Sequence, residues 1–243
     1  MNVYPDNTLT HFNTLLSKPL DLRGKWEVAM TGISYARSWY DITKNDGTFD
    51  FKRREDEPWV QNRYTIRTDV DPSIVAQRLS LKSAGILFEY LIGSGKFTVR
   101  LETDDPEHCK INAHGRMATL LGLRGVMTSI IEETTDKNGN AVHYVHYKMN
   151  DIADLQPIRQ FYVYTDIIEH QMVGDTTAPL LRNVPVQGSF GSMVNIDFTK
   201  LEYKTVSTGL VNTIKIDIRD DTGKPIPFNT GRVIVKVHFR QKL

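Results

Sequence analysis

Along most of the chain, hydrophobic and polar residues alternate with a period of two, which is the pattern of half-buried β-strands. Within residues 212–220, isoleucine occupies every second position from Ile214 to Ile218, with charged residues between. The alternation returns over residues 232–240, with valines and Phe239 on one face and basic residues on the other. Turn-forming residues 221–223 separate the two runs. The pattern therefore predicts two strands joined by a turn-rich connector.

Other segments predict further strands. Residues 161–168 are apolar on both faces, so we expect this strand at the centre of a sheet, covered on both sides. Residues 128–133 and 143–149 flank a strong turn signal at 136–140 and predict a hairpin. Shorter alternating runs predict strands at three more places: residues 25–30, 96–102 and 194–198.

The helical signal is weak by comparison. Residues 111–123 contain good helix formers, with Asn112 as an acceptable cap and Gly122 as a stop, and residues 72–82 predict another short helix. Many strands and few helices predict an all-β fold, a single jelly roll of two packed antiparallel sheets with one or two short helices. Long rim loops are expected at two stretches: residues 41–62 and 180–193.

Composition narrows the class of protein without naming a function. The chain has 243 residues, of which 40% are hydrophobic and 24% charged, as in an ordinary globular protein. A net charge of +1 excludes a protein that coats nucleic acid by bulk charge. The single Cys109 excludes an intramolecular disulfide framework and suits a reducing compartment. No signal peptide is evident, and residues 85–93, the most apolar stretch, are too short to span a bilayer.

Candidate catalytic chemistry is sparse. His143 and His146 are three residues apart in a predicted strand, so their side chains project from opposite faces and do not form a metal site. Cys109 has acidic neighbours, which raise the pKa of a thiol and argue against a nucleophile. Residues 93–97 lack the spacing of a phosphate-binding loop and predict a hairpin turn. We therefore expect no enzymatic activity, no catalytic residue, no metal and no cofactor.

Two groups of surface candidates remain. Residues 201–243 contain eight basic residues against four acidic ones, and part of this excess shares the polar face of the last predicted strand. That face is either a solvated, charge-protected edge or a contact for an acidic partner, with nucleic acid the weaker option. Its members are the following: Arg232, Lys236, His238 and Arg240. Separately, Trp39 and Trp59 could stack on sugars if they lie in loops, although aromatic residues more often pack in a core.

Three blocks of sequence resemble the minor capsid (penton) protein of Polinton/Maverick elements and adintoviruses, a family also present as transposon-derived reading frames. The first block, residues 7–42, contains a Trp-Glu-Val strand that leads to Ile-Ser-Tyr and Ser-Trp segments. The second, residues 161–186, contains Tyr-Thr-Asp-Ile, Val-Gly-Asp and Pro-Leu-Leu-Arg. The third, residues 212–240, surrounds a Thr-Gly-Lys-Pro-Ile-Pro-Phe connector. Residues 49–128 are less diagnostic, and Ala36 replaces an expected Pro.

The resemblance implies a jelly roll that assembles as a homopentamer and closes the fivefold vertices of an icosahedral capsid. Its partners would be further copies of itself and a double jelly-roll major capsid protein. It would belong to the virion, be made in the host cytoplasm and be assembled there or in the nucleus. We expect residues 1–19 to form an N-terminal arm, with Tyr4 and Pro5 at an interface, and residues 20–243 to form the jelly-roll domain.

Two other functions remain open. A carbohydrate-binding β-sandwich for receptor attachment would use Trp39 or Trp59 as ligand contacts. A cupin-like metalloenzyme shares the jelly-roll architecture but requires a cluster of metal ligands. Fold alone does not separate these functions from a capsid protein.

Overall fold

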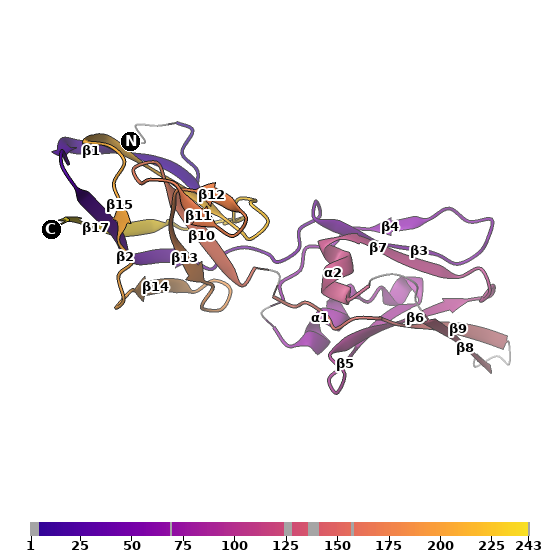
Figure 1. Ribbon diagram of the computed structural model, residues 1–243. Coiled ribbons are helices and arrows are strands. Elements are labelled where there is room, and N and C mark those ends of the chain that lie inside the picture. Colours follow the sequence, from indigo (N-terminus) through magenta and orange to yellow (C-terminus); the bar gives the residue numbers. More distant parts are fainter. Residues whose placement is uncertain (1–4, 69, 124–127, 136–140, 157, 243) are drawn as a thin grey trace. The chain divides into compact units, whose positions relative to one another are not determined.

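The computed structural model describes residues 5–68, 70–123, 128–135, 141–156 and 158–242 (Figure 1). The chain divides into two compact units. Unit 1 consists of Met1–Trp39 together with Ile158–Leu243, and unit 2 is Tyr40–Pro157. Unit 2 is therefore a continuous segment inserted into unit 1.

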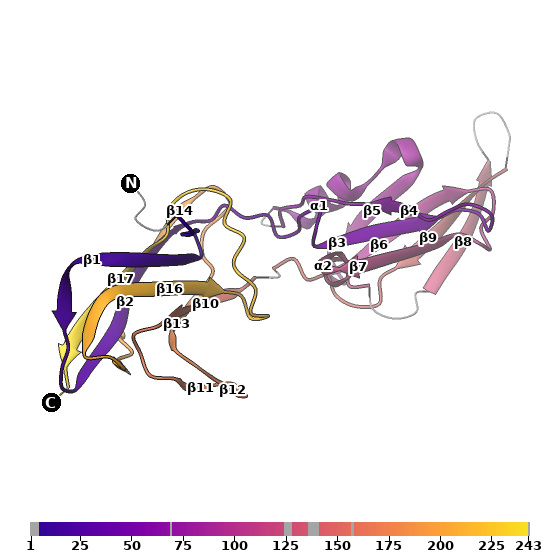
Figure 2. The same ribbon diagram turned by 90° about the horizontal axis from the view of Figure 1, so that it is seen from above.

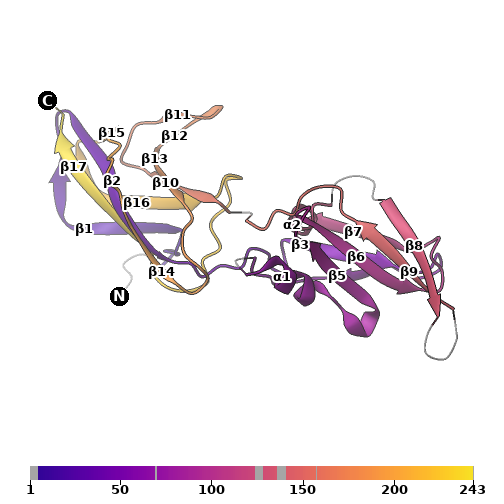
Figure 3. The same cartoon turned by 90° about the horizontal axis from the view of Figure 1, so that it is seen from below.

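Unit 1 is a sandwich of two antiparallel sheets. Sheet A has the strand order β1-β16-β10-β13, and sheet B places β2 against β14, β15 and β17 (Figures 2 and 3). A separate hairpin is formed by β11 and β12. The strands of unit 1 are β1 (His11–Asp21), β2 (Trp26–Ala36), β10 (Gln160–Thr165), β11 (Gln171–Val173), β12 (Thr176–Ala178), β13 (Leu180–Pro185), β14 (Met193–Asp197), β15 (Lys204–Thr205), β16 (Leu210–Arg219) and β17 (Ile234–Gln241).

The core of unit 1 lies between sheets A and B. Inward-facing residues of β2, such as Met30 and Tyr35, belong to the same buried cluster as Phe161 of β10 and Ile218 of β16. Alternate residues of each strand supply this layer, as expected for a sheet with one covered face. Val28 pairs with both Lys204 and Phe239, so β15 and β17 lie on opposite sides of β2.

Unit 2 packs a three-stranded sheet, β4-β3-β7, and a four-stranded sheet, β5-β6-β9-β8, around a second buried cluster with two short helices. Helix α1 begins after Asp71, whose carboxylate accepts a hydrogen bond from the Ser73 amide, and α2 ends at Gly122 with a φ of 71°. The elements are β3 (Gly47–Lys52), β4 (Val60–Asn62), α1 (Pro72–Leu79), the 3-10 turn η1 (Lys82–Ala84), β5 (Ile86–Leu91), β6 (Lys96–Thr103), β7 (Lys110–Gly115), α2 (Arg116–Leu121), β8 (Thr128–Thr135) and β9 (Ala141–Lys148).

The expected fold class is confirmed, since the protein is built from antiparallel sheets in jelly-roll-type sandwich packing with two short helices. The expected division of the chain differs from the structure. Strand β1 begins at His11, inside the proposed arm, and pairs with β16 from its first residue. The proposed single domain over residues 20–243 contains both unit 2 and most of unit 1. The arm's first four residues lie outside the described ones.

Several local expectations also need correction. Residues 110–115 form β7 rather than helix, because Ile111 and Ala113 alternate with polar residues and pair with β3. The proposed rim loop at 41–62 contains β3, whose Phe49 is fully buried, and β13 occupies the start of the other proposed loop. Strand β10 is central in sheet A but covered on one face only, since Tyr162 is half-buried on the other.

Candidate functional site

The basic strand predicted from the sequence is β17, at an edge of sheet B. Its valines and Phe239 pack against the core of unit 1, whereas the alternate side chains are exposed. Three predicted interface residues of this strand are exposed: Lys236, His238 and Arg240. Arg232 is also exposed, two residues before the strand begins. The predicted arrangement is therefore confirmed for the three residues within β17 but not for Arg232, and the role of this face in an interface stays a prediction.

Acidic residues on the same face neutralise part of this charge. Lys236 Nζ lies 3.1 Å from Asp197 Oδ1 on β14. Arg240 donates through Nε and Nη2 to Glu27 Oε2 on β2, at 3.1 and 2.9 Å. The bond from Arg240 lowers the pKa of Glu27, so that this carboxylate stays ionised. Among the proposed contact residues, Lys236 and Arg240 are thus committed to partners within the chain.

The side chains of these cross-strand pairs lie across β2, where outward-facing residues of β2 are small. A Cβ at Gly32 would lie 2.7 Å from Asp197 Oδ1 and 2.8 Å from the carbonyl oxygen of Ile196. Ala29 faces outward opposite His238, yet it is 0% exposed. Tyr203 precedes Lys204, the partner of Val28, and its hydroxyl reaches across β2 to His238 Nδ1 at 3.1 Å. The Arg240 guanidinium lies 3.5 Å from the centroid of the Tyr203 ring.

One side of the sandwich is closed by the segment between β14 and β15. Arg182 on edge strand β13 donates to the carbonyl oxygen of Lys200 at 3.1 Å and lies 3.6 Å from Glu202. The Arg182 guanidinium also lies 3.9 Å from the centroid of the Phe198 ring. The Arg182 side chain is only 12% exposed, and its contacts connect sheet A to the segment between β14 and β15. This edge is therefore covered within the chain.

The opposite side of the sandwich is open. There β1 is the edge of sheet A and β17 an edge of sheet B, and a groove of about 720 Å³ lies at that side. Its lining is mostly apolar or uncharged, with one basic side chain, Arg232. The residues that line it are Asn7, Thr8, Leu9, Phe12, Arg232, Val233 and Ile234. Ile234 is 53% exposed, although it is a large apolar side chain.

The remaining predicted contacts have mixed outcomes. Tyr4 lies outside the described residues, and Pro5 is exposed in a turn. Trp39 is 0% exposed and stacks with Tyr35 in the core of unit 1, so its proposed role as a loop contact for sugars is wrong. Its position in an aromatic cluster explains this, because the cluster fills one end of the sandwich core. Trp59 is 48% exposed just before β4 and stays a prediction.

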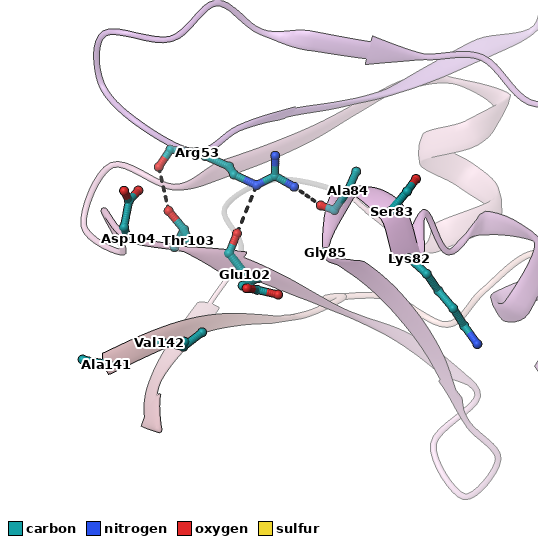
Figure 4. Close-up of a pocket in the computed structure, with 10 residues that line it drawn as sticks. All are labelled: Arg53, Lys82, Ser83, Ala84, Gly85, Glu102, Thr103, Asp104, Ala141 and Val142. Atoms are coloured by element: carbon teal, nitrogen blue, oxygen red, sulfur yellow. Dashed lines mark hydrogen bonds between the residues drawn. The ribbon is translucent and has the colours of Figure 1, made fainter. Parts of the chain in front are cut away.

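Unit 2 has a surface pocket of about 450 Å³, with Arg53 beside it (Figure 4). Arg53 Nε donates to the carbonyl oxygen of Glu102 at 3.0 Å, and its Nη2 donates to that of Ala84. Thr103 in turn donates to the carbonyl oxygen of Arg53 at 3.0 Å. These bonds tie the β3 end to β6 and η1. Arg53 is thus a structural bridge, and Asp104 at the rim is paired with Arg54, so the pocket indicates no ligand class.

The cysteine and the histidine pair lie in settings that do not suit catalysis. Cys109 is buried, and its burial raises the pKa of the thiol, as expected in direction, although desolvation exceeds the effect of the acidic neighbours. In the regular β9 ladder, His143 and His146 occupy opposite faces, and His146 lies 2.8 Å from Glu132. Among the described residues, no three His, Cys, Asp or Glu side chains gather as a metal site would require. The helices of the described chain are all too short or too polar to cross a bilayer.

Comparisons of the sequence with known proteins find no relative. No model of a known protein family matches the chain, and no curated protein matches it. Among solved structures, that of the selenomethionine-labelled mavirus penton protein is similar, with a TM-score of 0.49 and 11% sequence identity. The match covers 96% of this chain and 91% of that one.

Proposed function

We propose that this chain is a structural capsid protein, a penton that forms homopentamers at the fivefold vertices of an icosahedral capsid. The observation that carries the proposal is the location of the three penton-like blocks. Residues 7–42, 161–186 and 212–240 supply β1, β2, β10 to β13, β16 and β17, all in unit 1. Although distant in sequence, they pair directly as β1 with β16, β10 with β16 and β2 with β17.

The less diagnostic stretch, residues 49–128, falls entirely in unit 2. The resemblance therefore follows one folded unit, as expected if that unit is the assembly module and unit 2 is an insertion. The edges of unit 1 support the same function. A ring needs two different surfaces on each protomer, and unit 1 has one closed edge at Arg182 and one open edge beside Arg232.

The partners in this proposal are further copies of the chain and a double jelly-roll major capsid protein, and the place of action is the capsid vertex of the virion. Binding requires no chemical step, so specificity resides in interface shape and charge. Of the basic residues near β17, Arg232 is the one best suited to an acidic neighbour, because Lys236 and Arg240 are already paired with Asp197 and Glu27.

Two measurements test the proposal. Light scattering on a sizing column, at several concentrations, should give a species of five times the chain mass of 27.8 kDa. Co-expression with a double jelly-roll major capsid protein should then give particles that contain the chain at their fivefold vertices, as seen by electron microscopy. A monomer at every concentration that is also excluded from such particles would contradict the proposal.

A further inference from the structure

A small hairpin of unit 1 carries an apolar residue that the chain itself does not cover. Strands β11 and β12 pair over three positions, with Met172 opposite Thr177, and Gly174 at a φ of 64° forms the turn beside Asp175. Met172 is 82% exposed. Figures 2 and 3 show this hairpin projecting from the rest of unit 1.

The hairpin is anchored at its base rather than along its length. Gln171 Nε2 donates to the carbonyl oxygen of Leu180, and the Thr165 amide donates to that of Pro179 at 3.2 Å. Strands β11 and β12 pair with each other and with no further strand of the described chain. A thioether side chain adapts its shape to an irregular apolar site. The hairpin therefore projects from unit 1 and presents the exposed side chain of Met172 to a contact outside the chain.

The open groove between β1 and β17 offers apolar side chains that an exposed methionine could contact. Four apolar residues are part of its lining: Leu9, Phe12, Val233 and Ile234. Burial of an exposed methionine in such a groove stabilises association by the hydrophobic effect, at about 25 cal/mol per Å² of apolar surface. The hairpin of the same copy lies away from this groove, because it connects β10 to β13, and β16 and β10 separate the edge strand β13 from β1 in sheet A.

The charges are complementary as well. Among the described residues, Arg232 at the groove and Asp175 at the hairpin turn have no hydrogen-bond or ion-pair partner. Both are exposed. Charges at the rim of an interface fix its register and speed association. A basic residue at the groove and an acidic residue three positions after the exposed methionine match this arrangement.

From these observations we infer that the β11–β12 hairpin of one copy inserts Met172 into the β1/β17 groove of a second copy, with Asp175 meeting Arg232. The inference rests on the proposed homopentamer and identifies its interface. The contact joins two different surfaces, so it repeats from copy to copy in one direction, which is the kind of interface that a closed ring requires.

Cysteine cross-linking tests the contact directly. Two differently sized tagged chains, one carrying Met172→Cys and the other Ile234→Cys, are co-expressed, purified and oxidised with glutathione disulfide. The buried native Cys109, 5% exposed, is a poor competitor. The expected product is a disulfide-linked heterodimer of the two chains, with neither chain cross-linked to itself. The matched control pairs Met172→Cys with Ile92→Cys, an 84% exposed position in unit 2, and should give no such product.

Charge reversal provides an independent readout on intact protein. Arg232→Glu or Asp175→Lys alone should weaken assembly about fivefold, and the double variant should recover most of that loss. Met172→Asp should weaken it at least about tenfold. Met172 and Asp175 are exposed, so these variants leave the fold intact.

The outcomes separate this inference from the proposed function. Pentamers that form no disulfide between the Met172→Cys and Ile234→Cys chains would overturn the hairpin contact and leave the penton proposal standing. The same disulfide in a species of some other mass would support the contact and contradict the pentamer. A monomer that gives no cross-link would overturn both.

Discussion

The hydroxyl of Tyr203 and Nδ1 of His238 lie 3.1 Å apart, on opposite sides of strand β2, with Ala29 between their strands. This bridge explains why an outward-facing residue of a surface sheet is 0% exposed. It also makes the size of that residue critical, since the Tyr203 ring must lie across the backbone of β2. At Ala29, the outer face of sheet B is thus a layer of covering side chains and not merely a solvated surface.

Enlarging Ala29 tests this layer. We expect Ala29→Leu to lower the free energy of unfolding by about 1–3 kcal/mol, because the added methyl groups meet a covered site. Tyr203→Ala in the same chain should relieve most of that loss, since it removes the cover. Urea denaturation of the two single variants and the double variant measures the coupling. Equal losses from Ala29→Leu with and without Tyr203 would show that the bridge does not cover Ala29.

Arg182 should stabilise unit 1 by closing one edge of the sandwich. Arg182→Met keeps much of the side-chain volume but loses the bond to Lys200 and the contact with Phe198, so we expect a loss of about 1–3 kcal/mol. Arg182→Lys should retain part of it. In a Trp59→Phe background, fluorescence reports unit 1 alone, because both remaining tryptophans, Trp26 and Trp39, lie there. An unchanged midpoint in Arg182→Met would contradict this role.

His108 and Asp105 form a pair whose contribution to stability depends on pH. His108 Nδ1 lies 2.8 Å from Asp105 Oδ1, which raises the pKa of His108 from 6.5 and lowers that of Asp105 from 3.8. The histidine's contribution is complete below its unfolded pKa and is lost as pH rises through the raised folded value. The carboxylate's contribution is complete above its unfolded pKa and is lost as pH falls through the lowered folded value.

The pair therefore stabilises most between these two unfolded values. NMR titration of the His108 ring should give a midpoint above that of an unfolded histidine, and Asp105→Asn should lower it. The stability difference between the native chain and His108→Gln should shrink above the folded pKa of His108. A His108 midpoint that is the same in Asp105→Asn would rule out the pair as its cause.

Unit 2 should fold without unit 1. Every member of its buried cluster lies between Ile42 and Leu155, so excision removes none of its core. A fragment of residues 40–157 should give a dispersed NMR spectrum and a single cooperative thermal transition. A collapsed spectrum without a transition would show that unit 2 depends on unit 1 for stability.

The sequence predicted strands where alternation was strict and one face was covered. Strands β16 and β17 were found from this period, the β8–β9 hairpin was found from the turn signal between its strands, and Gly122 was identified correctly as a helix stop. The prediction was wrong at residues 110–115 because helix-forming residues follow directly in α2, and the two signals overlap in one window. Tyr162 was wrongly predicted to be covered, because a hydrophobic pattern counts tyrosine as apolar although its hydroxyl suits a solvent-exposed face.

The two-unit organisation could not be read from local patterns. The chain passes between the units at residues 39–40 and 157–158, and neither place is rich in the residues typical of linkers. The buried Trp39 lies directly beside the first of them. The ion pairs on the charged face of β17 could not be predicted for a similar reason. Alternation identified the exposed face of β17, but the partners Glu27 and Asp197 come from distant strands. The sequence of β2 did contain an indication of these crossing side chains, because the outward-facing residues Ala29 and Gly32 are small.

The inserted position of unit 2 has a consequence for the order in which the protein matures on the ribosome. All of unit 2 has been synthesised before β10, so it can fold while translation continues. Strands β1 and β2, by contrast, emerge first but find their main partners, β16 and β17, only near the end of the chain. Because such long-range pairing is slow, the nascent chain exposes two unpaired strands for most of its synthesis, and the edge formed by β1 and β17 is completed last.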